Sequence, residues 1–293
     1  MNDQAEILRK QVGALNEGDH AHEAKALAVL SGKGGVGKSN FSLNFSLALQ
    51  KKGYRVLLFD MDIGMGNIDI LMGMTATYTI VDLFEASLSV QQIIKKGPEG
   101  LSYIAGGSGI SSIFELSNHH LTYLIEQLSS LASDYDYIIF DMGAGMTENV
   151  LTFLKSMNDI IVITTPEPTS ITDAYAAVKF MSLYDINAPF HIVINKALSK
   201  KEGLLTYNRF EKAVQQFLHR SVYLLGAIPN DQSVIRAVNS QTPFFLYDVK
   251  SKASEELREI VKTYTSVNDQ QKNWQVEKQT SFVKKLKKFF LER

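Results

Sequence analysis

The sequence predicts a doubly wound α/β fold, in which a mostly parallel sheet of about seven strands carries helices on both faces. Three observations lead to this class. Short, almost continuously apolar runs alternate with stretches of helical periodicity, as expected when helices cover both faces of a parallel sheet. The 293 residues are 45% hydrophobic, which is enough for one large core. A glycine-rich segment joins the first apolar run to the first helical stretch, which is typical of a ligand site at the carboxyl ends of the strands.

The predicted strands are the apolar runs at 26–30, 55–59, 101–105, 137–140, 160–164, 191–194 and 222–228. The predicted helices lie near 40–52, 121–131, 170–184, 208–219, 233–239 and 254–263. We assign all of them to one domain over residues 25–265. Residues 1–24 form a separate leading segment with its own linker, and 266–279 are polar and aperiodic, which indicates a second linker.

Composition excludes several classes of protein. The net charge of −1 argues against broad nucleic-acid binding, and no nucleic-acid partner is expected. The absence of cysteine excludes disulfides, thiolate nucleophiles and iron–sulfur ligation. No run approaches the length of about 18 apolar residues that a membrane span needs, and the first residues do not resemble a signal peptide. We therefore expect a cytoplasmic protein.

The segment 31–39 matches the phosphate-loop pattern G-x-x-x-x-G-K-[ST], with Gly32, Gly37, Lys38 and Ser39 at the fixed positions. Glycines are needed because backbone amides must close around phosphate oxygens where a side chain would collide. Lys38 is expected to bridge the outer phosphates, and the Ser39 hydroxyl to bind Mg²⁺. The predicted nucleotide-binding residues of this loop are Gly34, Gly35, Val36, Gly37, Lys38, Ser39 and Asn40.

Carboxylates end two of the predicted strands. Asp60 and Asp62 follow the second strand and point the same way, because alternate residues of an extended chain share a face. Asp141 ends an apolar strand about 100 residues after the loop, which is the Walker B pattern of a magnesium-holding carboxylate. Carboxylates placed there act on water or on the magnesium shell. Gly143 follows, where its amide can face a γ-phosphate.

From Lys33 to Ser39 the loop reads K-G-G-V-G-K-S, which resembles the deviant phosphate loop of the MinD/ParA family of ATPases. That resemblance implies that Lys33 reaches the nucleotide of a partner subunit in an ATP-dependent homodimer. Residues 60–69 resemble the first switch of the family, D-x-D-I-G-x-x-N-x-D. By this match Asp62 orients the attacking water, and Asp60 supports magnesium or the water. Lys33, Lys38, Asp60 and Asp62 are therefore the predicted catalytic residues, and Ser39, Asp60 and Asp141 the predicted metal ligands.

Two later segments resemble the parts of the family that hold the base. Asn195 and Lys196 match an N-K element whose asparagine contacts adenine. Pro229, Asn230 and Asp231 match the I-P-x-D segment on the other side of the ring. The chain departs from the family in its second switch, where Met142 and Gly143 replace the usual serine and proline of D-x-P-A-G.

The last residues, 280–293, are predicted to form an amphipathic helix. Its apolar stripe is opposed by four lysines, a composition typical of a helix that lies on an anionic membrane surface. Residues of the stripe are Phe282, Val283, Leu286, Phe289 and Phe290. The alternative is a last core helix with a lysine-rich outer face.

The leading segment narrows the resemblance to the FlhG group, also called FleN or YlxH, which regulates flagellar number. Its residues Asp3, Gln4, Ala5, Leu8 and Arg9 resemble a peptide that stimulates the signal-recognition-type GTPase FlhF. The resemblance implies FlhF, flagellar basal-body (C-ring) proteins and anionic lipids as partners, with reversible peripheral binding to the inner face of the cell membrane. Placement of the division septum, as by MinD proper, is the alternative function. The apolar half of the terminal helix argues against a DNA-segregating role.

Overall fold

The strand that precedes the phosphate loop lies inside an eight-stranded sheet with the order β3-β4-β2-β5-β1-β6-β7-β8. The computed structural model describes residues 23–63, 65–86, 88–107, 118–143, 145–274 and 281–290. Neighbouring strands from β4 to β8 pair in parallel, whereas β3 pairs antiparallel with β4. The predicted fold class is confirmed, and the two-residue β3 is the strand that the sequence analysis did not include.

The strands are β1 (Lys25–Leu30), β2 (Val56–Met61), β3 (Lys95–Lys96), β4 (Ser102–Ile104), β5 (Tyr137–Met142), β6 (Asp159–Thr164), β7 (Phe190–Ala197) and β8 (Val222–Pro229). The helices are α2 (Lys38–Lys51), α3 (Ile68–Leu71), α4 (Ile80–Glu85), α5 (Val90–Ile93), α6 (Asn118–Leu131), α7 (Glu148–Lys155), α8 (Pro168–Leu183), α9 (Lys200–Leu218), α10 (Gln232–Asn239), α11 (Phe244–Tyr247), α12 (Lys252–Trp274) and α13 (Phe282–Phe290).

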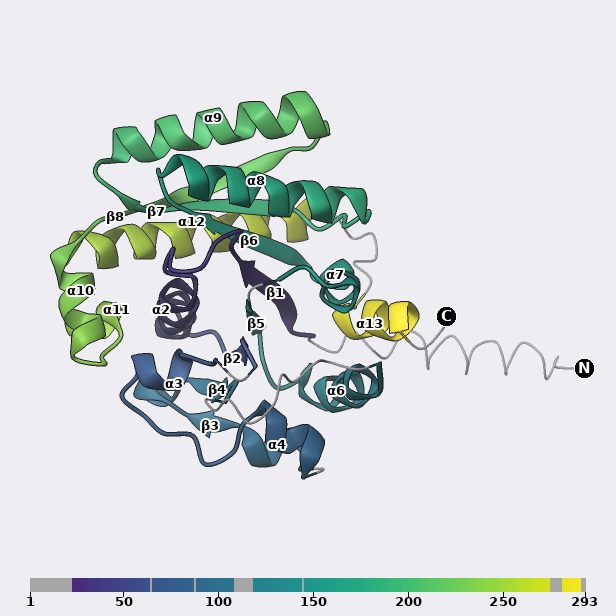
Figure 1. Ribbon diagram of the computed structural model, residues 1–293. Coiled ribbons are helices and arrows are strands. Elements are labelled where there is room, and N and C mark those ends of the chain that lie inside the picture. The colour runs from purple at the N-terminus through teal and green to yellow at the C-terminus, as the bar shows by residue number, and fades with distance from the viewer. Residues whose placement is uncertain are drawn as a thin grey trace, which may run out of the picture.

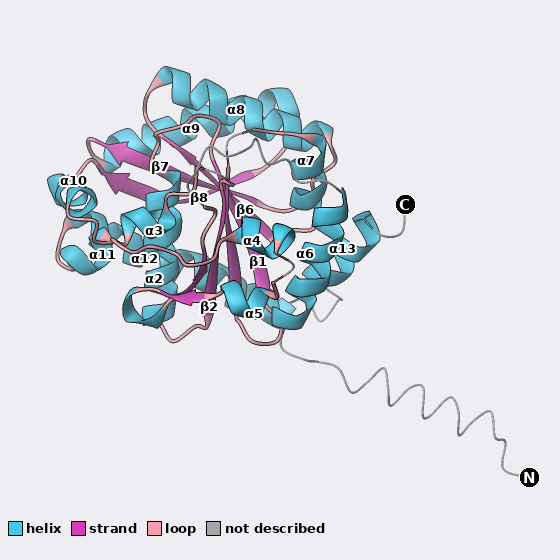
Figure 2. Ribbon diagram, turned by 60° about the horizontal axis from the view of Figure 1, so that its bottom comes forward, coloured by secondary structure: helices cyan, strands magenta, loops and turns pink. Residues whose placement is uncertain are grey.

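Helices cover both faces of the sheet (Figures 1 and 2). One core contains apolar side chains of α6, α7, α8, α9 and α13, and the other contains those of α2, α10, α11 and α12. Side chains of β2, β5 and β6 are buried along the whole strand, because each strand has helices above and below it. This is why these strands appear in the sequence as continuous apolar runs.

Strand register brings the functional carboxylates together. β5 lies between β1 and β2, and Asp60 of β2 pairs directly with Asp141 of β5. Since all three strands are parallel, their carboxyl ends meet at one edge of the sheet, beside the loop that follows β1. Motifs about 80 residues apart in the sequence are neighbours at that edge for this reason.

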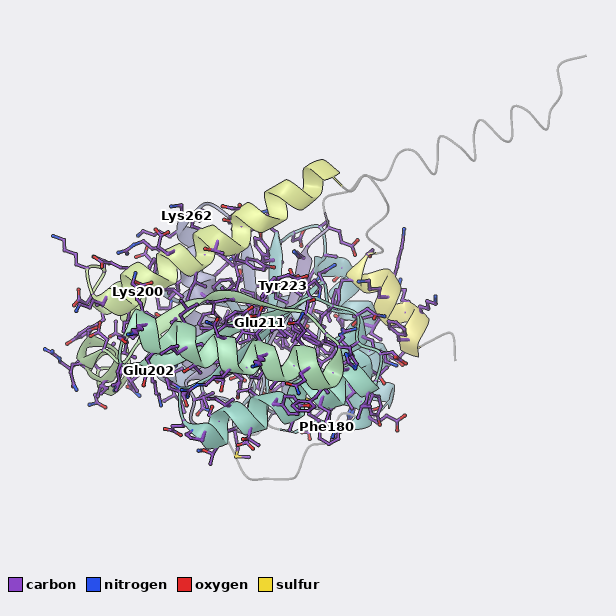
Figure 3. All side chains as sticks on the ribbon, turned by 90° about the horizontal axis from the view of Figure 1, so that it is seen from above. Phe180, Lys200, Glu202, Glu211, Tyr223 and Lys262 are labelled. Atoms are coloured by element: carbon purple, nitrogen blue, oxygen red, sulfur yellow. The ribbon has the colours of Figure 1, made fainter. Side chains whose placement is uncertain are left out.

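The outer edge of β8 faces solvent between α9 and α12 (Figure 3). Tyr223 of β8 is 53% exposed there. Lys200 of α9 and Glu256 of α12 form an ion pair. Gly203 allows α9 to approach the sheet, because a Cβ atom at this position would lie 2.5 Å from Cβ of Ala227.

Two helix boundaries differ from the predicted ones. α9 begins at Lys200 rather than near 208, and Ser199 caps it by accepting a hydrogen bond from the Glu202 amide at 3.1 Å. α12 continues to Trp274, so residues 266–274 of the predicted linker, which the sequence analysis read as aperiodic, are helical. No glycine or proline interrupts this stretch, and its two glutamines and one lysine are good helix formers. Residues 275–279 of the predicted linker lie outside the described part.

Candidate functional site

The phosphate loop is an open cradle between β1 and α2. Gly35 and Gly37 have φ angles of +78° and +92°, in the left-handed region that favours glycine. Gly32 is needed for a different reason, because a Cβ atom there would lie 2.1 Å from the backbone carbonyl of Asp173. Residues of the loop line a cavity of about 360 Å³, together with Asp62 and Asn67. The predicted loop residues thus line one cavity, except Val36, whose side chain is buried in the core.

Lys38 lies against the Walker B carboxylate. Its Nζ atom is 2.8 Å from Oδ1 of Asp141 and 3.2 Å from Oγ of Ser39. The Asp141 side chain is fully buried, and that of Lys38 is 12% exposed. A buried pair of this kind compensates two charges that would each be costly alone.

The two oxygens of Asp141 have different surroundings. Oδ1 also accepts a hydrogen bond from Oγ of Ser42 at 2.8 Å. Oδ2 is buried and has no hydrogen-bond partner within the described residues. Asp141 and the Ser39 hydroxyl both contact Nζ of Lys38, and a carboxylate with a free oxygen beside a hydroxyl offers the oxygen donors that Mg²⁺ prefers, so Ser39 and Asp141 fit the predicted metal.

Asp60 organises the loop that follows β2. Its Oδ1 accepts the amide of Asp62 at 3.0 Å, and its Oδ2 accepts those of Asn67 and Ile68 at 3.0 and 3.3 Å. Burial, together with the negative charge of Asp141, raises the pKa of Asp60 to about 7. Both oxygens are thus engaged by backbone amides, and a role of Asp60 at magnesium stays a prediction.

Asp62 lines the cavity and is partly buried. Burial raises the pKa of its carboxyl above the usual value, while the charge of Lys38 opposes this rise. Gly143 packs closely against it, since a Cβ atom at Gly143 would lie 3.3 Å from Cα of Asp62. The two predicted switch segments therefore touch each other beside the loop.

Lys33 lines the cavity, and its side chain contacts the start of α8. Its Nζ atom lies 3.4 Å from Oε2 of Glu167 and 3.2 Å from Oγ1 of Thr169, at the start of α8. The side chains of Lys33 and Glu167 are 42% and 66% exposed, so this contact is weak in water. The sequence analysis missed Glu167 and Thr169 as partners of this lysine.

The segments predicted to hold the base meet at a second cavity. Asn195, Lys196 and 229–231 line it together with Gly37 and Asn40. Asn195 donates to the Val36 carbonyl at 2.7 Å, and Lys196 to that of Gly35 at 2.8 Å. These two side chains thus hold the phosphate loop in place, and their contact with a base stays a prediction.

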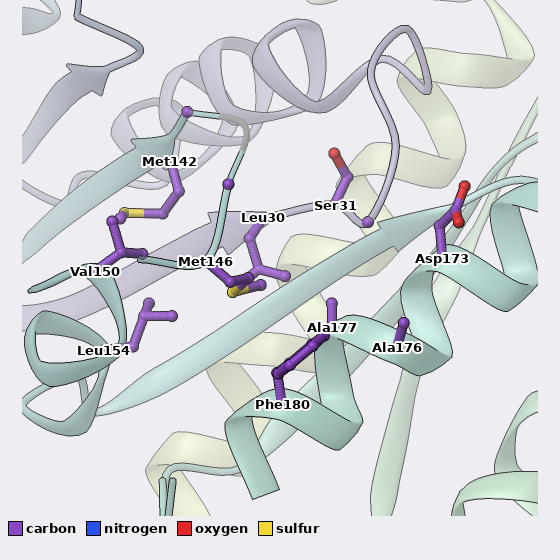
Figure 4. A pocket seen from close by; sticks show the side chains of 13 residues that line it. Leu30, Ser31, Met142, Met146, Val150, Leu154, Asp173, Ala176, Ala177 and Phe180 are labelled. Atoms are coloured by element: carbon purple, nitrogen blue, oxygen red, sulfur yellow. The ribbon is translucent and has the colours of Figure 1, made fainter. Parts of the chain in front are cut away.

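A further, mostly apolar cavity of about 170 Å³ lies on the other side of the loop (Figure 4). Met142 and Met146, on either side of Gly143 and Gly145, border it from one side, and Ala177 and Phe180 of α8 border it from the other. The segment after Asp141 therefore faces unfilled space, a feature that no sequence pattern predicted.

The terminal segment is helical, as predicted, and α13 packs on α6 and α7. Phe282, Val283 and Leu286 are 2%, 9% and 0% exposed, and Phe289 is partly buried. The ring of Phe282 lies 5.7 Å from that of Phe140, which directly precedes Asp141. Glu23 caps the helix by accepting hydrogen bonds from Oγ of Ser281 and, at 3.4 Å, from the amide of Val283. The first three residues of the apolar stripe, Phe282, Val283 and Leu286, are thus covered by the protein itself, as in the alternative of a core helix.

Several predicted residues cannot be placed. Asp3, Gln4, Ala5, Leu8 and Arg9 lie outside the described residues, as does the side chain of Phe290. Among the described helices, none is long and apolar enough to cross a membrane.

Comparisons with known proteins agree with this geometry. A family model described as ParA, NUBPL iron-transfer P-loop NTPase, matches residues 23–265. The antiactivator FleN of Pseudomonas aeruginosa is 34% identical over 84% of this chain and 85% of its own length. The flagellum site-determining protein YlxH of Helicobacter pylori is 34% identical over 82% of this chain and 83% of its own. MinD of Pyrococcus horikoshii complexed with Mg-ADP is similar in fold, with a TM-score of 0.68 and 23% identity, covering 84% of this chain and 97% of that one.

Proposed function

Because the chain belongs to the ParA/MinD family of P-loop NTPases, we propose that it is a magnesium-dependent ATPase switch that regulates the number and placement of flagella. The observation that carries the enzymatic part is that Lys38 and Asp62 line one cavity of about 360 Å³, while Asp141 forms a buried ion pair with Lys38. The flagellar part is supported by the similarity to FleN and YlxH. Septum placement is the second candidate, supported by the similarity in fold to MinD.

The first step is an exchange of partners by Lys38. In the single chain its ammonium neutralises Asp141, and an incoming polyphosphate offers a stronger set of negative charges. Lys38 then donates to the outer phosphate oxygens, while the backbone amides of the loop and the N-terminus of α2 surround the rest. Ser39 and Asp141 would hold Mg²⁺, which supplies neutralisation of phosphate charge.

Hydrolysis requires a water aligned with the terminal phosphate. Asp62 is the best placed residue for this task, because it lines the cavity beside Gly143 and its position is set by the amide contacts of Asp60. Its carboxylate accepts a hydrogen bond from the water and orients it for attack. Gly143 then offers its amide to the terminal phosphate.

Dimerisation with ATP is supported by the rim of the site. Exposed apolar side chains lie on, or next to, the segments that line the phosphate-loop cavity and the cavity of the predicted base-binding segments, where a second copy would cover them. They are Met65 (72% exposed), Ile70 (45%), Ile235 (47%) and Val238 (39%). Lys33 would leave Glu167 and Thr169 and cross to the partner's nucleotide, which costs little because that contact is exposed.

Membrane binding then depends on release of α13. Its lysines Lys284, Lys287 and Lys288 already face outward, whereas its apolar stripe must leave α6 and α7 before it can enter a lipid surface. Removing one buried large side chain from its groove costs about 1.5–3 kcal/mol, and insertion into lipid returns a similar amount. Two helices held together in a dimer bind far better than one, through their effective concentration.

The leading segment, residues 1–24, is proposed to activate the GTPase FlhF, with Gln4 as the stimulating residue. Glu23, at its end, is the cap of α13, so the two proposed interaction segments meet at one point of the protein. Basal-body (C-ring) proteins are the other proposed partners, and the expected location is the cytoplasmic face of the cell membrane.

The test is sedimentation with anionic liposomes in ATP or ADP, with hydrolysis measured in parallel. The parent protein should hydrolyse ATP and sediment more in ATP than in ADP. Asp62→Ala should bind ATP, fail to hydrolyse it and accumulate on the liposomes. Lys33→Ala should bind nucleotide normally but lose ATP-dependent dimerisation. Hydrolysis at the parent rate by Asp62→Ala would contradict the assigned role of this residue.

A peptide of residues 1–20 should by itself stimulate the GTPase of FlhF, because the motif is local. A matched peptide with Gln4→Ala should not. If neither peptide had an effect, septum placement would become the better candidate.

A further inference from the structure

Two residues donate to Oδ1 of Asp141, and one of them, Ser42, lies outside the phosphate-loop pattern. Ser42 lies on α2, three residues after Ser39, and is 0% exposed. Its Oγ atom is 2.8 Å from Oδ1 of Asp141 and 3.1 Å from the carbonyl oxygen of Lys38. A hydroxyl has one proton to donate, and an ionised carboxylate at the shorter distance is the stronger acceptor. Ser42 therefore holds Oδ1.

Oδ1 has two donors, and only one of them is expected to stay in contact with it when nucleotide binds. The Lys38 ammonium, at 2.8 Å, has to turn to the phosphates when nucleotide binds. Ser42 has no such second task, because its side chain is enclosed and lies behind the carboxylate. Once Lys38 has left, Ser42 is the remaining donor that the described structure provides to either oxygen of Asp141.

We propose that Ser42 is a positioning residue that fixes the Asp141 carboxylate so that Oδ2 stays free to hold Mg²⁺. This inference rests on the proposed nucleotide-dependent function. Loss of the Ser42 hydroxyl should lower the affinity for the metal and leave the affinity for the phosphates unchanged, because Ser42 acts only through Asp141. Partners of this kind, behind a metal-binding group, commonly change metal affinity by about 10–100-fold when they are removed.

Ser46 offers a matched control on the same helix. It lies one turn later, is also 0% exposed, and donates to the Ser42 carbonyl at 2.7 Å. Its replacement by alanine removes the same atom from the same core without touching Asp141. Any general loss of packing or helix stability should therefore appear equally in both variants.

The experiment measures the affinity of the full chain for a fluorescent ADP analogue, with excess Mg²⁺ and with EDTA. In the parent and in Ser46→Ala, Mg²⁺ should strengthen binding. In Ser42→Ala this strengthening should fall by about tenfold, while the affinity in EDTA stays the same. Binding of Mn²⁺, followed by its paramagnetic resonance signal in the presence of ADP, should weaken in parallel. Ser42→Thr, which keeps the hydroxyl, should restore both.

Each other outcome overturns the proposal. Equal magnesium dependence in Ser42→Ala and the parent would mean that Asp141 needs no fixed orientation. Equal losses with Mg²⁺ and with EDTA would mean that Ser42 only supports the loop. If the parent itself bound no nucleotide, the proposed function would fail first, and that result differs from both. Should Ser42→Ala not fold, Ser42→Cys carries the same expectation, because its thiol is of similar size and a weak donor.

Discussion

Two buried aspartates, at opposite ends of the same parallel sheet, show how a functional site differs from a structural one. Asp141 lies at the carboxyl end, where one oxygen contacts Lys38 and Ser42 and the other has no partner among the described residues. Asp159 begins β6 at the amino end and has partners on both oxygens. His191 lies 3.2 Å from its Oδ1, and Tyr264 donates to Oδ2 at 2.7 Å, beside the ammonium of Lys25.

Folding shifts the pKa values of the buried aspartates in opposite directions at the two ends of the sheet. At the amino end, burial alone would raise the pKa of Asp159, but the hydrogen bond from His191 and the charge of Lys25 outweigh it and hold the pKa below its usual range. At the carboxyl end, the pKa of Asp60 rises to about 7 through burial and the neighbouring charge of Asp141. The charge of Asp159 is thus compensated by its neighbours at the amino end, whereas at the carboxyl end two carboxylates are crowded at the site that we propose binds a cation and phosphates.

The largest expected effect is that of Lys38→Ala. Nucleotide affinity should fall by at least about a hundredfold, because the outer phosphates lose their ammonium donor. The same change leaves Asp141 buried without its counter-charge, so the free energy of unfolding of the nucleotide-free protein should drop by about 3–5 kcal/mol. Fluorescent-nucleotide titration and urea unfolding measure the two effects. Lys33→Ala is the control and should change neither by much.

Asp159→Asn tests whether the amino end of the sheet affects stability independently of the nucleotide site at the carboxyl end. It breaks a buried network and should lower the free energy of unfolding by about 3–5 kcal/mol, while nucleotide affinity stays close to that of the parent. Glu259→Gln on α12, which breaks an exposed pair with Lys262, should hardly move the unfolding midpoint. A loss of nucleotide binding by Asp159→Asn at a temperature where it is folded would mean that the ends are coupled.

The pH dependence of stability should have opposite signs at the two ends, in magnesium-free protein. The pKa of Asp159 is lowered on folding, so its contribution is present above about pH 4 and is lost as the pH falls further. The pKa of Asp60 is raised on folding, so its contribution is full below about pH 4 and is lost as the pH rises to about 7. When urea unfolding is measured across this range, the free energy of unfolding of Asp60→Asn should therefore fall less toward pH 7 than that of the parent. The free energy of unfolding of Asp159→Asn should fall less than that of the parent as the pH drops below about 4. A parallel pH curve for Asp60→Asn and the parent would contradict the raised pKa.

Residues of the phosphate-loop and Walker B patterns could be recognised in the sequence, because the chemistry of these motifs demands fixed residue types at fixed spacings. Gly37, Lys38 and Asp141 are examples. The alternation of strands and helices along the chain predicted a parallel sheet, and this was enough to place these three residues at one edge of it. Ser42 and Glu23 could not be predicted, because a serine inside a helix or a glutamate before a strand has many uses. The docked position of α13 depends on grooves of α6 and α7 that only the folded chain creates. The amphipathic pattern alone suits a membrane and a core equally well.

The smallest expected effect concerns Glu23, where the leading segment meets the terminal helix. Glu23→Gln weakens the cap of α13 by about 1 kcal/mol, because a neutral amide accepts backbone and hydroxyl protons less strongly than a carboxylate does. The fraction of protein with α13 undocked should then rise about fivefold, and liposome binding without nucleotide should rise with it. Glu126→Gln is the control, since Glu126 is exposed on α6 and forms no ion pair with another described residue. Increased liposome binding by both variants would reflect net charge. If neither variant differed from the parent, the cap would not restrain the helix, and its apolar contacts with α6 and α7 alone would hold it.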